Sequence, residues 1–186
     1  MDLGEAAHAH PGRRALAAAE HLGEGELVQW CAELISGRRV YGAPDDPDPA
    51  WLGGAAASGW GAPDRLTAET EYWPRVWAAR TLLYVWEDAA IPAVLDGLHD
   101  RAWRVREMSL KVALRWEVAE ALEPCTGLID DSTPRVRLAA IRLLGELGEA
   151  EHLEVLGSAA FDEPGEREAV DRAVLRAERR LDRPLR

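Results

Sequence analysis

Residues 131–144 read DSTPRVRLAAIRLL, and their pattern is the clearest indication of the fold in this sequence. Its apolar residues Val136, Ala139 and Leu143 recur at intervals of three and four. Such spacing places them on one face of a helix with 3.6 residues per turn. A carboxylate opens the stretch, where it favours the positive end of the helix dipole, and Pro134 suits a first helical turn. The stretch therefore predicts an amphipathic helix that begins close to Pro134.

The pattern of this stretch recurs along the chain. It is present as Pro74-Arg75-Val76, Trp103-Arg104-Val105 and Pro134-Arg135-Val136, and a weaker fourth copy starts at Pro164. Successive valines are 29 and 31 residues apart, and a second apolar segment follows each copy, at residues 89–100, 120–131 and 151–162. Two such short helices cannot each bury an apolar face alone, so the repeat predicts helix pairs that stack on their neighbours. No alternating β-branched run lies between them, and we expect no sheet.

The repeat also resembles a known family. Residues 131–140 carry the pattern Asp-x-x-Pro-x-Val-Arg-x-x-Ala, and Ile91-Pro92-Ala93-Val94 opens the best second helix. This resembles the short HEAT-like repeat of the phycobilisome-lyase type, closely over residues 71–162 and loosely over residues 163–181. The chain is also similar to bacterial HEAT-repeat proteins without an assigned activity. The resemblance implies an all-α fold, built as a right-handed α-α superhelix of the HEAT/armadillo type.

Two positions depart from the repeat of this family. The arginine that follows the valine is present as Arg106 and Arg137, but the first copy has Trp77 there. The last copy has Glu166 in place of the valine. We therefore expect the last helix, residues 166–180, to be a polar C-terminal cap.

The chain is expected to form a single domain in three parts. These are N-terminal capping helices at residues 1–36, an irregular connecting loop at residues 37–63, and HEAT-like repeats with a C-terminal capping helix at residues 64–186. The loop is rich in proline and glycine but holds Trp51 and Trp60, so we expect it to be pinned down. The first repeat has an apolar pair, Leu82 and Trp86, where other copies have charges. Either the loop covers this pair or the pair is an open binding patch, and we favour cover.

Composition restricts the possible functions. The 186 residues carry a net charge of −11, which argues against binding to nucleic acid or to an anionic membrane. No stretch is apolar for long enough to span a bilayer, and the N-terminus does not read as a signal peptide. The two cysteines lack CxxC spacing and fit reduced thiols, so we expect a cytoplasmic protein.

Motifs for catalysis and cofactor binding are missing from the sequence. None of GxGxxG, GxxxxGK[ST], HExxH or GxSxG occurs, and the five histidines are not spaced as a ligand set. We therefore expect no catalytic residue, no cofactor and no metal, and a protein that is not an enzyme.

A strip of cations is the most suggestive surface feature. Positions one before, six after and ten after each valine share one side of the opening helix, away from its core face. Trp103 lies opposite the core stripe beside the first of these cations, and tryptophan with arginine is typical of interface hot spots. Stacking between repeats would explain Trp103 equally well, and a solvated convex face would explain the charges. We define the basic ridge as Trp103, Arg104, Lys111, Arg115, Arg135 and Arg142.

Three functions remain open at this stage. The leading one is a protein-interaction scaffold whose ridge binds a protein partner with an acidic surface. A second is nucleic-acid binding, as in HEAT-like alkylpurine glycosylases, which the net charge disfavours and a filter-binding assay would test. A third is a lyase or a lyase-chaperone subunit, which the type of repeat implies, although no residue indicates a pigment pocket.

Overall fold

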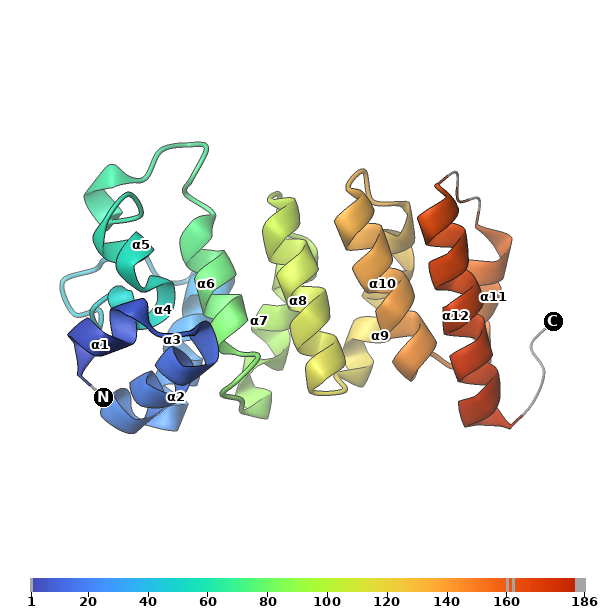
Figure 1. Cartoon of the computed structure of the whole chain (residues 1–186), viewed down its shortest axis with the longest axis horizontal. Coiled ribbons are helices and arrows are strands. Elements are labelled where there is room, and N and C mark those ends of the chain that lie inside the picture. Colours follow the sequence, from blue (N-terminus) through green and yellow to red (C-terminus); the bar gives the residue numbers. More distant parts are fainter. Residues whose placement is uncertain (1, 160, 162, 183–186) are drawn as a thin grey trace. The chain divides into compact units, whose positions relative to one another are not determined.

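The computed structural model describes residues 2–159, 161 and 163–182, and within them the regular elements are all helices (Figure 1). The α-helices are α1 (Leu3–His8), α2 (Pro11–Leu22), α3 (Glu24–Ile35), α4 (Ala50–Gly53), α5 (Ala55–Ser58), α6 (Trp73–Thr81), α7 (Ile91–Leu98), α8 (Trp103–Arg115), α9 (Leu122–Thr126), α10 (Pro134–Leu147), α11 (Ala150–Ser158) and α12 (Pro164–Leu181). Single 3₁₀ turns lie at Pro63–Arg65 (η1), Asp88–Ala90 (η2), Ala119–Ala121 (η3) and Gly127–Asp130 (η4). The prediction of an all-α fold is confirmed.

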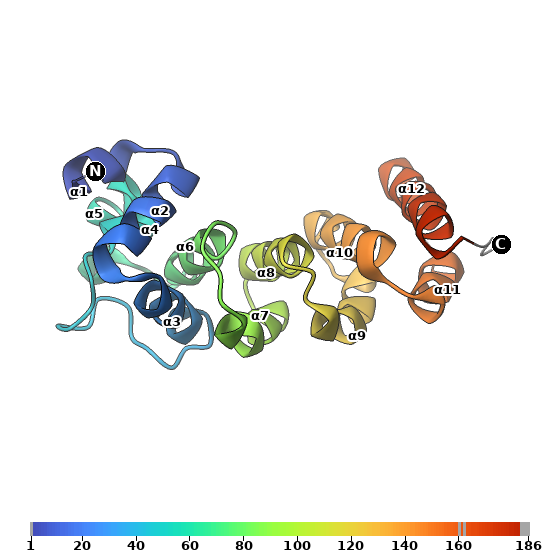
Figure 2. The ribbon, with the colours of Figure 1, turned by 90° about the horizontal axis from the view of Figure 1, so that it is seen from below.

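The chain divides into two compact units, Met1–Gly97 and Leu98–Arg186. In the second unit, α8, α10 and α12 pack side by side, and α9 and α11 form a second row against them (Figure 2). Helix α10 begins at Pro134, as the sequence predicts. The repeat valines Val105 and Val136 are fully buried, because the 3.6-residue period turns them toward the packed side. Each opening helix thus pairs with a shorter second helix.

Largely buried ion pairs join consecutive repeats of the second unit. Arg106 donates to both carboxylate oxygens of Asp131, at 2.7 and 3.0 Å, and to the carbonyl oxygen of Asp100 at 2.7 Å. One repeat later, Arg137 donates to Glu166 and to the carbonyl oxygen of Asp131, each at 2.8 Å. The arginine after the repeat valine therefore links its own repeat to the next one, and we call this series the arginine ladder.

The ladder changes the chemistry of its acids. Burial alone would raise the pKa of Asp131, but hydrogen bonds from Arg106 and from the backbone N–H of Thr133 outweigh it and lower the pKa. Glu166 stands where the other copies have valine and is 4% exposed. A carboxylate is tolerated there because Arg137 pairs with it at 2.6 Å.

The first unit contains the predicted N-terminal helix pair, found as α2 and α3. Helix α3 packs along α6, the opening helix of the first repeat, and Leu82 just after α6 is fully buried. Trp86 is partly exposed and donates its indole N–H to Asp88 at 3.0 Å.

Residues 37–63 are less irregular than expected, because they contain the single-turn helices α4 and α5. Trp51 is buried and stacks on His21 with 5.1 Å between ring centroids. Trp60 packs on Trp73 and Trp77 near the start of α6, with centroids 5.6 and 5.7 Å away. The expectation that this segment packs on the first repeat is thus confirmed for Trp60, whereas its cover of Leu82 and Trp86 stays a prediction.

Candidate functional site

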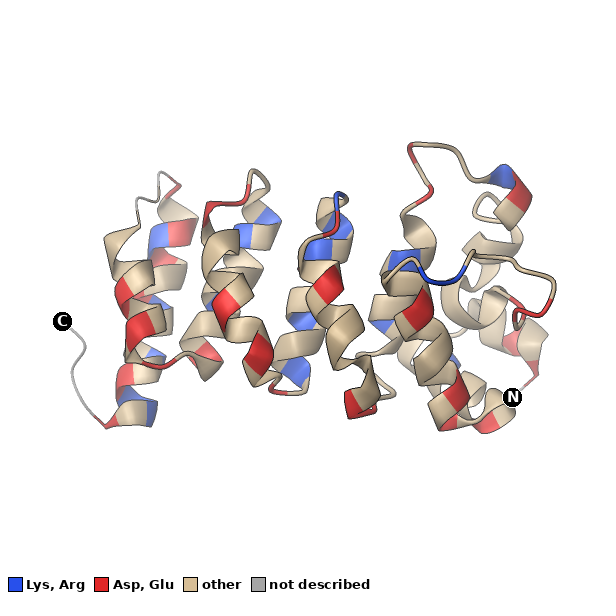
Figure 3. Ribbon diagram, turned by 180° about the vertical axis from the view of Figure 1, so that it is seen from behind, with Lys and Arg blue, Asp and Glu red and all other residues tan. Residues whose placement is uncertain are grey.

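The basic ridge lies on α8 and α10 of the second unit, where Figure 3 colours the basic residues blue. Its centre is Trp103, the first residue of α8. The guanidinium carbon of Arg104 lies 4.3 Å from the centroid of the Trp103 ring, and that of Arg135 lies 6.0 Å from it. Arg135 belongs to α10, so two neighbouring repeats meet at this ring. The arrangement supplies cation–π attraction and fixes two positive charges beside an apolar surface.

The remaining ridge cations differ in how free they are. Lys111 donates to Glu107 at 2.8 Å, so its charge is neutralised by a carboxylate that is only 9% exposed. The guanidinium of Arg115 lies over the ring of Trp116 at 5.1 Å. Arg142 is exposed, and the described part of the chain offers it neither a hydrogen bond nor an ion pair. The unneutralised charge of the ridge therefore rests on Arg115, Arg135 and Arg142.

On α12, the cations at the strip positions are paired with acids. Glu146, at the end of the α10 strip, pairs with Arg176 of α12 at 2.5 Å. Arg172 pairs with Glu168 on its own helix at 3.4 Å. Such exposed pairs add little stability, but they cancel charge. Among the described residues of this strip on α8, α10 and α12, the cations without a carboxylate partner thus lie on α8 and α10.

Sequence reasoning missed one ridge residue. Leu138 stands between Arg135 and Arg142 on α10 and is 39% exposed. Leu138 follows Val136 by two residues, which places it away from the core face of a helix with 3.6 residues per turn. Its exposure could therefore have been predicted from the sequence. The ridge therefore offers an apolar side chain between two exposed guanidinium groups, which is a composition suited to protein recognition.

The described residues contain no group of three or more His, Cys, Asp or Glu side chains that could hold a metal ion. Both cysteines are buried, and burial raises the pKa of Cys125 to about 12 and that of Cys31 further still. Neither thiol can supply a thiolate near neutral pH. Within the same residues, no helix is both long and apolar enough to cross a membrane.

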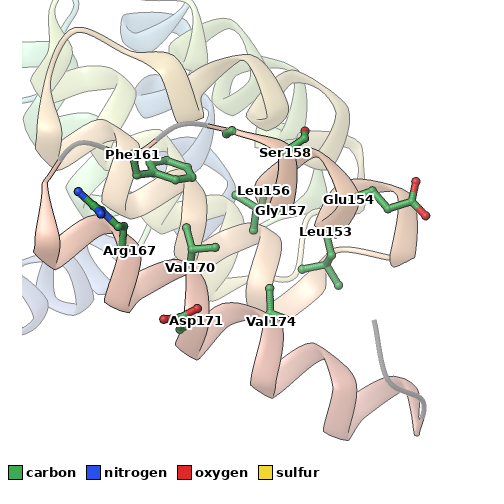
Figure 4. Close-up of a pocket in the computed structure, with 11 residues that line it drawn as sticks. Leu153, Glu154, Leu156, Gly157, Ser158, Phe161, Arg167, Val170, Asp171 and Val174 are labelled. Atoms are coloured by element: carbon green, nitrogen blue, oxygen red, sulfur yellow. The ribbon is translucent and has the colours of Figure 1, made fainter. Parts of the chain in front are cut away.

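A groove of about 670 Å³ lies between α11 and α12 (Figure 4). Its floor is apolar, with Leu156 and Val170 among the lining residues, and Arg167 and Asp171 stand at its edge. Glu154, Ser158, Arg167 and Asp171 also line the groove, but all four are exposed, whereas a ligand site normally places its few polar groups where the ligand is largely buried. We therefore keep the ridge as the candidate site.

The comparison with known families agrees with the helix pairs. Residues 91–176 match the family model of HEAT repeats, which takes in α7 through most of α12. No curated protein and no solved structure gives a significant match. The match is to HEAT repeats in general, so the lyase-type subdivision remains a prediction. With its stacked helix pairs and this family match, the part of the chain from residue 91 to residue 176 is an array of HEAT-like repeats.

Proposed function

We propose that the protein is a non-enzymatic scaffold that binds an acidic surface of a protein partner through the basic ridge. HEAT repeats are generally protein-interaction modules, because stacked helix pairs present a long surface made of equivalent positions. In this protein, the positions that contact the partner are those of the basic ridge on α8 and α10.

The observation that carries the proposal is the setting of Trp103. Its ring is flanked by Arg104 and Arg135 from two adjacent helices, and Leu138 and Arg142 extend the surface along α10. A large aromatic ring beside arginines is the usual centre of a protein interface. Fixed guanidinium groups favour a partner with carboxylates, because they bind both oxygens of a carboxylate at once.

Nucleic acid would use the same cations, and the experiment must separate the two. Binding to phosphates depends steeply on salt and little on an apolar anchor. Binding to a protein depends on its central aromatic or arginine residues and survives moderate salt. The overall charge of −11 weakens attraction to a polyanion, but it leaves a local positive ridge intact.

The test is a pull-down from native lysate with matched variants. The ridge variant is Arg115→Glu, Arg135→Glu and Arg142→Glu, because these three side chains are exposed. Lys111 is left unchanged, since a glutamate there would face the nearly buried Glu107. The control variant is Arg13→Glu, Arg38→Glu and Arg179→Glu, three exposed arginines outside the ridge. Both variants change the net charge by the same amount.

We expect a partner that the wild type and the control variant recover equally and that the ridge variant loses. Recovery should persist after nuclease treatment and fall with Trp103→Ala. Equal recovery by the folded ridge variant would reject the ridge as the binding surface. Recovery that disappears with nuclease, together with salt-sensitive binding of a labelled DNA duplex, would favour the nucleic-acid function instead.

A further inference from the structure

Helix α3 of the first unit carries an exposed acidic face, seen in red along this helix in Figure 3. Glu26 and Gln29, one turn apart, are exposed and line two grooves that flank them. The larger groove has a volume of about 510 Å³, and the smaller about 190 Å³. We call the larger one the α3 groove.

The α3 groove joins an apolar floor to an acidic rim. Val28 and Ala32 lie in the floor and are 1% and 5% exposed. Gly25 keeps the floor low, since the Oε1 of Glu87 lies 3.3 Å from where a Cβ of residue 25 would stand. Glu26 and Glu87 both line the groove, and within the described residues neither carboxylate has a hydrogen bond or an ion pair. The groove thus places two unneutralised carboxylates beside small apolar side chains.

Such a groove fits a long cationic side chain. Arginine and lysine place an aliphatic stem on apolar surface and keep the charged head among polar groups. An arginine lying in the α3 groove would cover Val28 and Ala32 with its methylenes and bring its guanidinium to the carboxylates of Glu26 and Glu87. A neutral or anionic side chain would leave both carboxylates uncompensated.

The smaller groove is a different kind of surface. Arg39 in its wall pairs with Glu33 at 3.2 Å, with Asp45 at 3.3 Å, and also with Asp46. The three carboxylates share this one guanidinium, and the same contacts fix the wall. The smaller groove thus already holds a cation of the chain itself, whereas the carboxylates of the α3 groove have no such partner among the described residues.

We infer that the occupant of the α3 groove is the basic ridge of a second copy of this chain. The inference rests on the proposed function, because it uses the same ridge and identifies the acidic surface that the ridge recognises. Residues 1–97 hold 15 acidic and 7 basic residues, a net charge of −8, whereas the ridge presents exposed Arg135 and Arg142. Every molecule thus carries both a cationic side chain of the required length and an acidic groove that fits it.

The two surfaces differ, so the contact is head-to-tail. Contacts of this kind build open chains, or rings where the geometry closes, rather than saturating as symmetric dimers. Exposed ion pairs are individually weak and are screened by salt. Association should therefore appear at high protein concentration and low salt and should disappear at high salt.

The experiment is sedimentation velocity of the purified full chain over a range of concentrations at low and at high salt. The groove variant is Glu26→Lys and Glu87→Lys, and the ridge variant is the triple arginine reversal described above. The matched control is Asp64→Lys and Glu69→Lys, two exposed acids of the same unit that do not line the α3 groove. Circular dichroism confirms that each variant is folded.

We expect the wild type and the control to associate at low salt, and each reversed variant alone to lose this association by about tenfold or more. Mixing the two reversed variants should restore assembly. The basic groove of the groove variant can bind the acidic ridge of the ridge variant, and the unaltered ridge of the first can bind the unaltered groove of the second. A wild type that stays monomeric at low salt and high concentration overturns the inference. So does a mixture that remains dissociated.

The two proposals fail in different ways. A monomeric wild type whose ridge variant still loses a partner in the pull-down rejects self-association and leaves the proposed function standing. A wild type whose association is unchanged by the ridge variant, and whose pull-down is also unchanged, rejects both.

Discussion

Replacing Arg106 by methionine tests the arginine ladder, because it removes the guanidinium and keeps a side chain of similar length. The side chain of Arg106 is 14% exposed and that of Asp131 is 6% exposed, so the change leaves a carboxylate uncompensated in a largely buried place. Breaking a buried ion pair from one side costs about 3–5 kcal/mol. Because both side chains keep some contact with solvent, we expect the lower end of this range, a loss of about 3 kcal/mol in the free energy of unfolding.

Chemical denaturation followed by circular dichroism measures this loss, and hydrogen exchange in α8 and α10 locates it. Arg142→Met is the matched control, since Arg142 is exposed and outside the ladder, and it should change stability by no more than about 0.5 kcal/mol. Adding Asp131→Asn to Arg106→Met should cost less than the sum of the single changes, because the uncompensated charge is gone. Equal losses for Arg106→Met and Arg142→Met would refute the reasoning.

The same pair predicts a pH dependence with a definite sign. The folded pKa of Asp131 is below its unfolded value, because hydrogen bonds from Arg106 and Thr133 overcome the effect of burial. A lowered carboxyl pKa adds stability that is present above the unfolded pKa of about 3.9 and is lost as the pH falls through the folded pKa. The stability difference between the wild type and Arg106→Met should therefore be full near neutral pH and shrink in acid. A difference that stays constant down to the folded pKa would contradict this assignment.

Two further predictions concern helix contact and thiol chemistry. Gly145→Ala should destabilise the protein by about 1–3 kcal/mol, because a Cβ there would lie 2.5 Å from the Cβ of Ala173 on α12. Gly157→Ala places its Cβ in open space and should be neutral or stabilising. Thermal unfolding compares the two variants. Cys31 and Cys125 should resist alkylation at neutral pH in the folded protein and react once it is denatured, which mass spectrometry reads directly, and rapid native labelling of either would contradict their burial.

Local signals made the repeat helices predictable. Pro134 and the spacing from Val136 to Leu143 specify both the start and the buried face of α10, because a fixed proline φ and a 3.6-residue period act within a few residues. The helices within residues 37–63 lacked such a signal. The segment around α4 and α5 is mostly glycine and alanine, and tertiary contacts stabilise it, including the hydrogen bond from Arg14 to the carbonyl oxygen of Leu52 at 3.2 Å.

The ridge was predictable as a strip but not as a set of contacts. Helix phase places Arg135 on the same side as Arg104, yet only packing of α8 against α10 brings Arg135 to the ring of Trp103. The pair of Glu107 and Lys111 has i, i+4 spacing and was readable from the sequence. Counting the cations alone overlooks this ion pair, and it therefore overstates the unneutralised positive charge of the ridge.

The α3 groove could not be seen in the sequence. Its floor comes from α3, and Glu87 at its rim comes from just before η2, more than fifty residues further along the chain. Gly25 gives no local reason for its presence inside a helix, since its backbone is helical and a glycine there is unfavourable. The Glu87 carboxylate lies close to where a Cβ of residue 25 would stand, and only the folded chain brings the two together.

The ladder also governs where a stack of this kind can be shortened. Arg137 finds its side-chain acceptor on α12, so a chain cut before Pro164 would lose Glu166 and keep a largely desolvated guanidinium. A few polar substitutions can make the newly exposed apolar surface soluble, but they do not replace the carboxylate that pairs with Arg137. A shortened form of this protein should therefore end on a helix that supplies an acid to the last arginine of the ladder.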